Sequence, residues 1–256
     1  MLTTLLAACI AIQEPKLLPT PTVFVDALAI ATYKNKVWTP ITAPMKVDLP
    51  FKAYRLDLVT TTTATTVYEL EYSDGVIGNF LPGHQSNGVM WSGPKPKYSR
   101  SIRTANPEQT DYNVLVKDFV RSQLKKEPDF KIEITTIIRC DLDGDGKEEV
   151  LIQAGHQGIS DQYSFEPRKT GNLSCTLLRH IKNGKAITEP IFFFHSPTGA
   201  DQEPIQITHL KSIADLTGDG NYEVIISADY YEGQSAHIFN LVKGQFKLLV
   251  ENGAGA

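Results

Sequence analysis

The chain has 256 residues, of which 41% are hydrophobic and 21% are charged, as in an ordinary globular protein that can bury a sizeable core in one or two domains. Its formal net charge of -4 and pI near 5.9 exclude nucleic acid as the main partner, because no basic excess is available for phosphate contacts.

The N-terminal stretch is apolar but too short to span a membrane. Its residues Leu6-Ala7-Ala8-Cys9 resemble a bacterial lipobox, in which the cysteine is lipidated and becomes the mature N-terminus. No Lys or Arg precedes Cys9, although a signal peptide has a positive start, and a start codon assigned too late would explain this departure. A plain secretion signal or an ordinary N-terminal segment is the alternative. We therefore expect residues 1–20 to be a signal-like segment and linker. The protein would be secreted, or held at the cell surface or in the periplasm by a lipid at Cys9, its one expected link to a membrane.

Residues 21–105 are predicted to form an N-terminal β region with a long loop. The pattern of Ala27–Ile41 predicts a hairpin, since two strand-like runs flank a Lys-Asn turn. The segments Tyr54–Val59 and Val67–Tyr72 alternate apolar and polar residues, as half-buried strands do. The stretch Phe80–Arg103 is rich in Gly, Pro, Ser and basic residues, which predicts a long loop able to hold binding residues. Its ring-bearing candidates are His84, Trp91 and Tyr98.

A helix is predicted after this loop. Asn106 is a suitable N-cap and Pro107 a suitable first helical residue, whereas Lys125, Lys126 and Pro128 close the segment. Apolar residues recur between these limits at helical spacing, and we expect this stripe to pack on a sheet. The stripe consists of Tyr112, Leu115, Val116, Phe119, Val120 and Leu124.

A short acidic loop occurs twice in the second half of the chain. In both copies, oxygen-bearing side chains stand at positions 1, 3, 5 and 9, and glycines stand at positions 4 and 6. Several oxygens converging from one tight, glycine-permitted turn suit a hard cation such as Ca2+. Position 7 would add its backbone carbonyl. The candidate ligands are Asp141, Asp143, Asp145, Lys147 and Glu149 in the first loop, and Asp215, Thr217, Asp219, Asn221 and Glu223 in the second.

The two loops differ in charge. The four carboxylates of the first loop would repel one another without a cation. The second loop has Thr217 at position 3, and the smaller number of charges predicts weaker binding there. An acidic turn that binds no metal is the alternative for either loop.

An EF-hand is the obvious rival, but its essential bidentate Glu at position 12 is missing. Counting from Asp141 gives Ile152, and counting from Asp215 gives Ile226. The runs that flank the loops, such as Ile132–Cys140, are rich in β-branched residues and therefore indicate strands rather than helices.

The loops resemble the calcium-loop repeats called FG-GAP or VCBS repeats, which occur in integrin α-subunit propellers and in many bacterial surface and secreted proteins. The family pattern is Asp-x-Asp-x-Asp-Gly-x-x-Asp/Glu between two strands, and the likeness covers residues 131–250. Thr217 departs from this pattern, and the Phe-Gly element that names the family is not evident. The calcium ligands that the resemblance implies are Asp141, Asp143, Asp145, Glu149, Asp215, Asp219 and Glu223.

The strand pattern of residues 131–195 recurs in residues 205–250, with the order strand, acidic loop, strand and hairpin. In the first repeat Asn183-Gly184 is a strong hairpin signal. We therefore predict a mainly β fold of antiparallel four-stranded blade-like repeats, propeller-like or stacked as sheets, with one helix in the middle of the chain. The helix and both repeats would make up residues 106–256. So few blades cannot close a conventional propeller alone, which leaves a small barrel-like assembly, association of copies, or stacked sheets.

Cys140 and Cys175 both fall in predicted strands. In an exported protein they can pair as a disulfide or remain as two buried free thiols. They do not have the paired spacing of a zinc site.

No catalytic motif stands out in the sequence. His156 is followed by Ser160, Asp161 and Tyr163, which can be a nucleophile–base–acid group or simply a polar connecting loop. The aromatic and acidic stretch Asp229–Gly233 could contact a sugar ring or pack on a neighbouring unit.

Two functions fit these observations. The first is a non-enzymatic, calcium-binding, exported or surface-anchored β-repeat protein that contacts a protein or glycan. The alternative is an extracellular polysaccharide hydrolase or lyase that uses the repeats as a scaffold. The second function requires a pair of facing carboxylates, and the acids outside the loops show no evident pairing: Glu69, Glu71, Asp74, Asp229 and Glu232.

Overall fold

The computed structural model describes residues 14–58, 65–72, 78–81, 88–156, 172–196, 206–230 and 232–255. These residues form three sheets and one helix. The N-terminal sheet has the strand order β1-β5-β7-β2-β3-β4, with β6 paired to β5. Its strands are β1 (Lys16–Leu17), β2 (Thr22–Val25), β3 (Leu28–Lys34), β4 (Val37–Pro40), β5 (Phe51–Leu58), β6 (Thr65–Tyr72) and β7 (Val89–Trp91).

The two predicted four-stranded repeats make up most of the other two sheets, and residues 102–104 add a fifth strand to one of them. The middle sheet has the order β12-β11-β10-β9-β8, and the C-terminal sheet has the order β13-β14-β15-β16. Every neighbouring pair in both sheets is antiparallel. The middle strands are β8 (Ile102–Thr104), β9 (Ile132–Cys140), β10 (Glu149–His156), β11 (Asn172–Lys182) and β12 (Lys185–Ser196). The C-terminal strands are β13 (Ile207–Ala214), β14 (Glu223–Tyr230), β15 (Gly233–Val242) and β16 (Gln245–Gly255).

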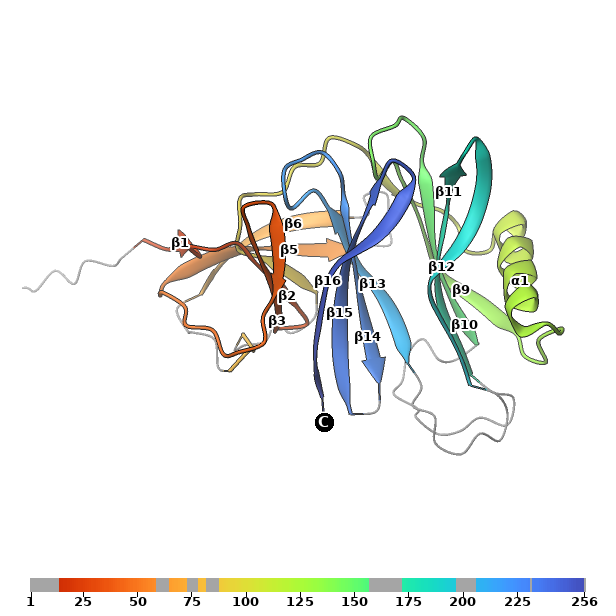
Figure 1. Cartoon of the computed structure of the whole chain (residues 1–256), viewed down its shortest axis with the longest axis horizontal. Coiled ribbons are helices and arrows are strands. Elements are labelled where there is room, and N and C mark those ends of the chain that lie inside the picture. Colours follow the sequence, from red (N-terminus) through yellow and green to blue (C-terminus); the bar gives the residue numbers. More distant parts are fainter. Residues whose placement is uncertain are drawn as a thin grey trace, which may run out of the picture.

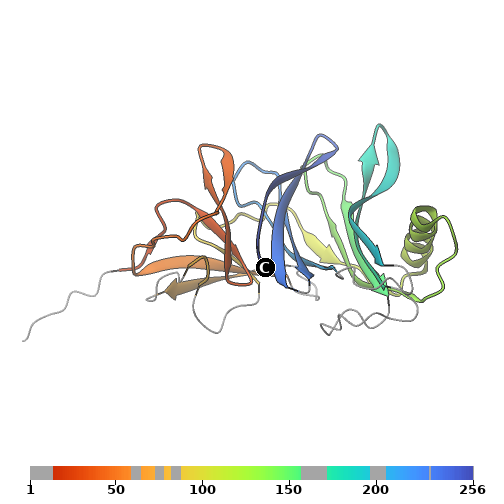
Figure 2. The same ribbon diagram turned by 60° about the horizontal axis from the view of Figure 1, so that its bottom comes forward.

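The C-terminal sheet lies between the other two, so that the described residues form stacked layers (Figure 1, Figure 2). One buried cluster joins the N-terminal and C-terminal sheets and includes Leu56 and Ile238. Another joins the C-terminal and middle sheets and includes Val224 and Leu151. The predicted mainly β fold with one helix is confirmed. Its sheets stack, and the described residues form no closed barrel or propeller.

Tight turns close the long hairpins. Asn183 and Gly184 both have positive φ, 52° and 76°, as the Asn-Gly signal predicts. The β3–β4 hairpin has the same backbone conformation at Asn35 and Lys36. Turns of this kind match the right-handed twist of the strands that they join, and they fix the register of both hairpins.

The prediction of a long loop over Phe80–Arg103 is wrong where the structure has two short strands, β7 and β8. Strand β7 lies in the interior of the N-terminal sheet, between β5 and β2. Trp91, predicted as a binding candidate, is fully buried there and donates its Nε1–H to the carbonyl of Pro94 over 2.8 Å. The sequence conceals β7 because it is only three residues long, stands among glycines and prolines, and pairs with distant segments. His84 lies outside the described residues.

The helix α1 (Thr110–Leu124) begins later than predicted. Asn106 accepts the backbone N–H of Glu108 over 2.9 Å and forms a turn ahead of the helix, while Gln109 occupies the N-cap. The predicted end is correct, because Lys125 has φ 56° and stops the helix. The apolar side of α1 packs on the outer face of the middle sheet (Figure 1). Among the described residues, no helix has the length and apolarity to cross a membrane.

Cys140 and Cys175 are buried free thiols. They lie on strands at opposite sides of β10, and Cys140 joins the cluster facing the C-terminal sheet while Cys175 joins the one facing α1. They therefore cannot pair. Burial raises the pKa of each thiol to about 12.

Candidate metal centre

Both acidic loops join equivalent strands. The first connects β9 to β10, and the second connects β13 to β14. The glycines at positions 4 and 6 have positive φ in both loops, 78° and 84° at Gly144 and Gly146, and 73° and 90° at Gly218 and Gly220. Glycine adopts this backbone conformation at little cost, so each loop turns back sharply on its own first residue.

In the first loop, Asp141 organises the turn. Its carboxylate accepts the backbone N–H of Gly144 over 2.7 Å and that of Gly146 over 3.1 Å. Glu149 reaches back from the start of β10 and accepts the N–H of Leu142 over 2.9 Å. The loop thus closes on two carboxylates, one at each end.

The second loop repeats these bonds at the same spacing. Asp215 accepts the N–H of Gly218 over 2.7 Å and that of Gly220 over 3.2 Å. Glu223 accepts the N–H of Leu216 over 2.8 Å. The side chain of Thr217 donates to Glu223 over 3.3 Å, so the residue that departs from the calcium pattern binds a neighbouring carboxylate. The two loops are therefore copies of one local structure.

The first loop brings together three of its predicted ligands. One side-chain oxygen from each of Asp141, Asp143 and Glu149 lies within 4.8 Å of the others, which is a group that can hold a metal ion. Asp145 is exposed and accepts both the backbone N–H and the side-chain amine of Lys147, and these bonds lower its pKa. Among the described residues, only the first loop has such a convergence of metal-ligating side chains.

Both terminal glutamates are buried, Glu149 with 4% and Glu223 with 1% of its surface exposed. Burial raises the pKa of Glu149 to about 7, and the charges of Asp143, Asp145 and Asp141 add to the rise. Burial likewise raises the pKa of Glu223 to about 8, and Asp219 and Asp215 add to it. The backbone N–H groups of Leu142 and Leu216 oppose these shifts. Each loop thus holds a buried carboxyl with too little positive charge around it.

Two residues that the sequence analysis did not identify join the loops to each other. Tyr222 is fully buried, and its backbone N–H donates to the carbonyl of Leu142 over 2.9 Å. The guanidinium of Arg100 lies 4.4 Å from the centre of the Tyr222 ring, 3.7 Å from Asp141, and within hydrogen-bonding reach of the carbonyls of Leu142 and Gly220. The backbone N–H of Arg100 donates to the Tyr222 hydroxyl over 2.9 Å.

A sequence signal for this junction exists. Tyr222 is an aromatic residue at position 8 of an acidic loop, and the segment from Lys95 to Arg103 is basic, which complements the acidic loops. That segment runs from β7 to β8 and pairs with the second loop through a backbone bridge between Lys97 and Asp215. The loops therefore lie beside the segment that links the N-terminal sheet to the middle sheet, at the point where this segment contacts the C-terminal sheet.

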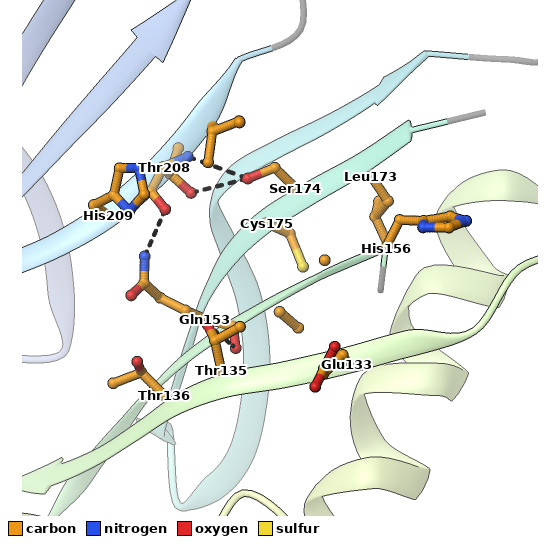
Figure 3. A pocket seen from close by; sticks show the side chains of 13 residues that line it. Glu133, Thr135, Thr136, Gln153, His156, Leu173, Ser174, Cys175, Thr208 and His209 are labelled. Atoms are coloured by element: carbon orange, nitrogen blue, oxygen red, sulfur yellow. Dashed lines mark hydrogen bonds between the residues drawn. The ribbon is translucent and has the colours of Figure 1, made fainter. Parts of the chain in front are cut away.

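A cavity of about 230 Å³ lies elsewhere, at one end of the interface between the middle and C-terminal sheets (Figure 3). Its walls include Gln153, Ser174 and Thr208, which are largely buried. Gln153 donates its side-chain amide to the carbonyl of Thr208 over 2.7 Å, and Ser174 Oγ accepts the backbone N–H of Thr208 over 3.2 Å. The apolar interface thus ends in a polar, internally bonded layer.

Within the described part of the chain, the other predicted acids pair with separate partners. Glu69 pairs with Lys52 over 3.1 Å, and Asp229 lies 3.3 Å from His209. The hydroxyl of Tyr230 lies over Gly233, where an added Cβ would come within 2.8 Å of it. Several predicted residues lie outside the described part of the chain: Cys9, Asp74, Ser160, Asp161, Tyr163 and Tyr231.

A scan against protein-family models finds no match to this chain, and neither a search of curated proteins nor a search of solved structures finds one.

Proposed function

We propose that the chain is a calcium-binding β-repeat protein, exported or anchored at the cell surface, that contacts a protein or a glycan. The observation that carries this proposal is the convergence of Asp141, Asp143 and Glu149, whose oxygens lie within 4.8 Å of one another. A Ca2+ ion about 2.4 Å from each oxygen fits inside such a group. The resemblance to FG-GAP and VCBS repeats supports the same ion.

The donor set favours calcium over other common metals. All side-chain donors in both loops are oxygens, whereas structural zinc sites are built from cysteine and histidine. Magnesium demands a rigid octahedron and retains several waters, but calcium accepts irregular sets of carboxylates and backbone carbonyls. The carbonyls of Lys147 and Asn221, at position 7, are the backbone donors that the pattern supplies.

The role we propose for the ion is structural. Calcium would compensate the buried charges of Glu149 and Glu223, which otherwise favour protonation. Because Arg100 and Tyr222 connect the loops to each other, ordering of the loops would also order the junction of the sheets. A rigid stack of sheets would then present its surface to a partner.

Export is the second part of the proposal. Extracellular calcium is high enough to fill sites of modest affinity, which suits a second loop with fewer charges. The Leu6-Ala7-Ala8-Cys9 sequence supplies the lipid attachment. Mass spectrometry of the native protein tests this part, since an unmodified Cys9 or a cleavage elsewhere would contradict a lipid anchor.

Isothermal titration calorimetry tests the calcium sites. We expect Ca2+ to bind the wild-type protein and the control Glu108→Gln equally, because Glu108 is an exposed acid in the turn before α1. Asp143→Asn should lose the tighter of two binding events. Equal binding by Asp143→Asn and the control would contradict the site, and a stronger heat with Mg2+ than with Ca2+ would contradict the choice of ion.

A further inference from the structure

Three polar side chains of the C-terminal sheet form a hydrogen-bonded series away from the acidic loops. Ser235 Oγ lies 3.1 Å from His237 Nε2, and His237 Nδ1 lies 3.1 Å from a carboxylate oxygen of Glu251. The serine and the carboxylate therefore use different nitrogens of one imidazole. This is the order of contacts in a nucleophile–base–acid triad, which is recognised by geometry rather than by sequence position.

The strands hold this arrangement in place. Ser235 and His237 are two residues apart on β15, so their side chains lie on the same face of the sheet. Glu251 stands opposite His237 in the register between β15 and β16. The imidazole also packs against Phe192 of the middle sheet, with ring centres 4.9 Å apart. Both the pairing and the packing thus restrict the orientation of His237.

The imidazole has the properties of a general base. Burial lowers the pKa of His237, and the nearby Glu251 opposes this shift. This shift favours the neutral ring, and when Glu251 accepts the Nδ1 hydrogen, Nε2 is left to accept the proton of Ser235. We propose that Ser235, His237 and Glu251 form a hydrolytic centre that transfers the acyl group of a small carboxylic ester to water. This activity does not depend on the proposed role of calcium.

The cross-strand neighbours of Ser235 are small. They are Ala228 on β14, whose side chain is a single methyl group, and Gly253 on β16, which has no side chain. Ser235 is half-buried and Gly253 is exposed, so solvent reaches this part of the sheet. The Tyr230 hydroxyl lies over Gly233, the preceding residue of β15 on the same face, and it is the donor that we assign to the oxyanion.

The polar cavity lies along the same row of the sheet. Thr208, which lines the cavity, stands opposite Ala228, which in turn stands opposite Ser235. Neighbouring strands are about 4.8 Å apart, so Ser235 is roughly 10 Å from Thr208. The wall of the cavity of about 230 Å³ at Thr208 thus lies two strands away from Ser235 (Figure 3 shows Thr208).

The reaction proceeds in two acyl transfers. Ser235 Oγ bonds to the ester carbonyl carbon while its proton passes to His237 Nε2, and the resulting oxyanion collapses to expel the alcohol, which takes that proton. Water then attacks the acyl-serine and gives a proton to His237. Collapse of the second oxyanion breaks the bond to Ser235 Oγ, which recovers the proton, and the carboxylic acid leaves.

The test uses the purified full chain, p-nitrophenyl acetate as the ester, and an alkyl fluorophosphonate as the label for an activated serine. We expect turnover in the wild type, label on Ser235 by peptide mass spectrometry, and loss of both in Ser235→Ala. His237→Gln should reduce turnover by about 10²-fold or more, which is the usual contribution of a general base. Tyr230→Phe and Glu251→Gln should reduce turnover while leaving thermal unfolding nearly unchanged.

Gln234→Ala is the matched control, because Gln234 lies on the same strand but on the opposite face. It should retain the turnover and the label of the wild type. Because Ser235→Ala removes only one half-buried hydroxyl, its melting temperature should stay close to that of the wild type. Turnover by Ser235→Ala equal to that of the wild type, or a label on another residue, would overturn the proposal. Wild-type protein without turnover or label would also overturn it.

Discussion

The backbone N–H of Tyr222 donates to the carbonyl of Leu142 over 2.9 Å and so joins the two acidic loops directly. Arg100 reinforces the same contact, since its guanidinium lies against the Tyr222 ring and near the Leu142 carbonyl. The two loops come from different sheets. They therefore form one junction in the stack, and a mutation in either loop should alter the structure of the other.

The proposed ligands can be ranked by charge. Asp143→Ala removes a carboxylate from the converging group, whereas Thr217→Ala removes only a hydroxyl that donates to Glu223. We expect Asp143→Ala to weaken calcium binding more, because affinity in such loops follows the number of charged ligands. Calorimetric titration of both variants is the measurement. Equal losses of affinity would count against the ligand assignment.

Arg100→Ala should destabilise the protein by about 2–4 kcal/mol, because it leaves partly buried carbonyls and a carboxylate without their charged donor. Arg103→Ala is a matched control from the same basic segment. Arg103 pairs with Glu148 over 2.5 Å but has 56% of its side chain exposed, so its loss should cost only about 0–1 kcal/mol. Urea unfolding compares the two. Similar losses would show that Arg100 does not hold the junction together.

Two glycines of the first loop allow a sharper test of Arg100. A Cβ at Gly146 meets nothing within 4 Å, so Gly146→Ala should cost about 1 kcal/mol, through its positive φ alone. A Cβ at Gly144 would lie 2.6 Å from a guanidinium nitrogen of Arg100, so Gly144→Ala should cost more. The extra cost should disappear in an Arg100→Ala background. A double-mutant cycle by urea unfolding measures this coupling, and additive effects would contradict it.

The raised pKa of Glu223 predicts an unusual pH dependence in the metal-free protein. Below about pH 4.5 this carboxyl is protonated in both the folded and the unfolded state. As the pH rises toward 8, the unfolded state releases its proton first, so the folded state becomes less favourable relative to it. Stability contributed by Glu223 is therefore lost between about pH 4.5 and 8.

Glu223→Gln isolates this effect, because the amide is neutral at every pH. We expect the free energy of unfolding of the wild type to fall relative to that of the variant across this range, with chelator present throughout. A difference between the two proteins that stays constant with pH, or that changes in the opposite direction, would contradict the assigned cause.

Local features of the fold could be predicted from the sequence. The β-branched runs gave the strands around both loops, and the turn at Asn183-Gly184 gave the hairpin, because each signal depends on adjacent residues. Strand β7 could not be predicted, since its three residues owe their conformation to the distant strands β2 and β5. The position of the C-terminal sheet between the other two likewise depends on contacts between residues that are far apart in the sequence.

The candidate metal site also combines features that local sequence patterns predict with contacts that they do not. Repeated spacing identified Asp141, Asp143 and Glu149, which the structure brings together. Spacing did not show that Asp145 binds Lys147 instead, nor that Arg100 lies at the junction. The cross-strand contact between His237 and Glu251 depends on the register of β15 and β16, which no local pattern specifies.

Thermal unfolding with excess Ca2+ and with chelator shows whether the loops bind calcium and whether the ion stabilises the fold. Ligand at about 100 times its dissociation constant stabilises the folded state by about 2.7 kcal/mol per site, which corresponds to a rise of roughly 5–10 °C in melting temperature for a chain of this size. We predict such a rise in the wild type and a smaller one in Asp143→Ala. Identical melting temperatures with calcium and with chelator, after confirmed removal of metal, would show that the loops are acidic turns that do not bind calcium.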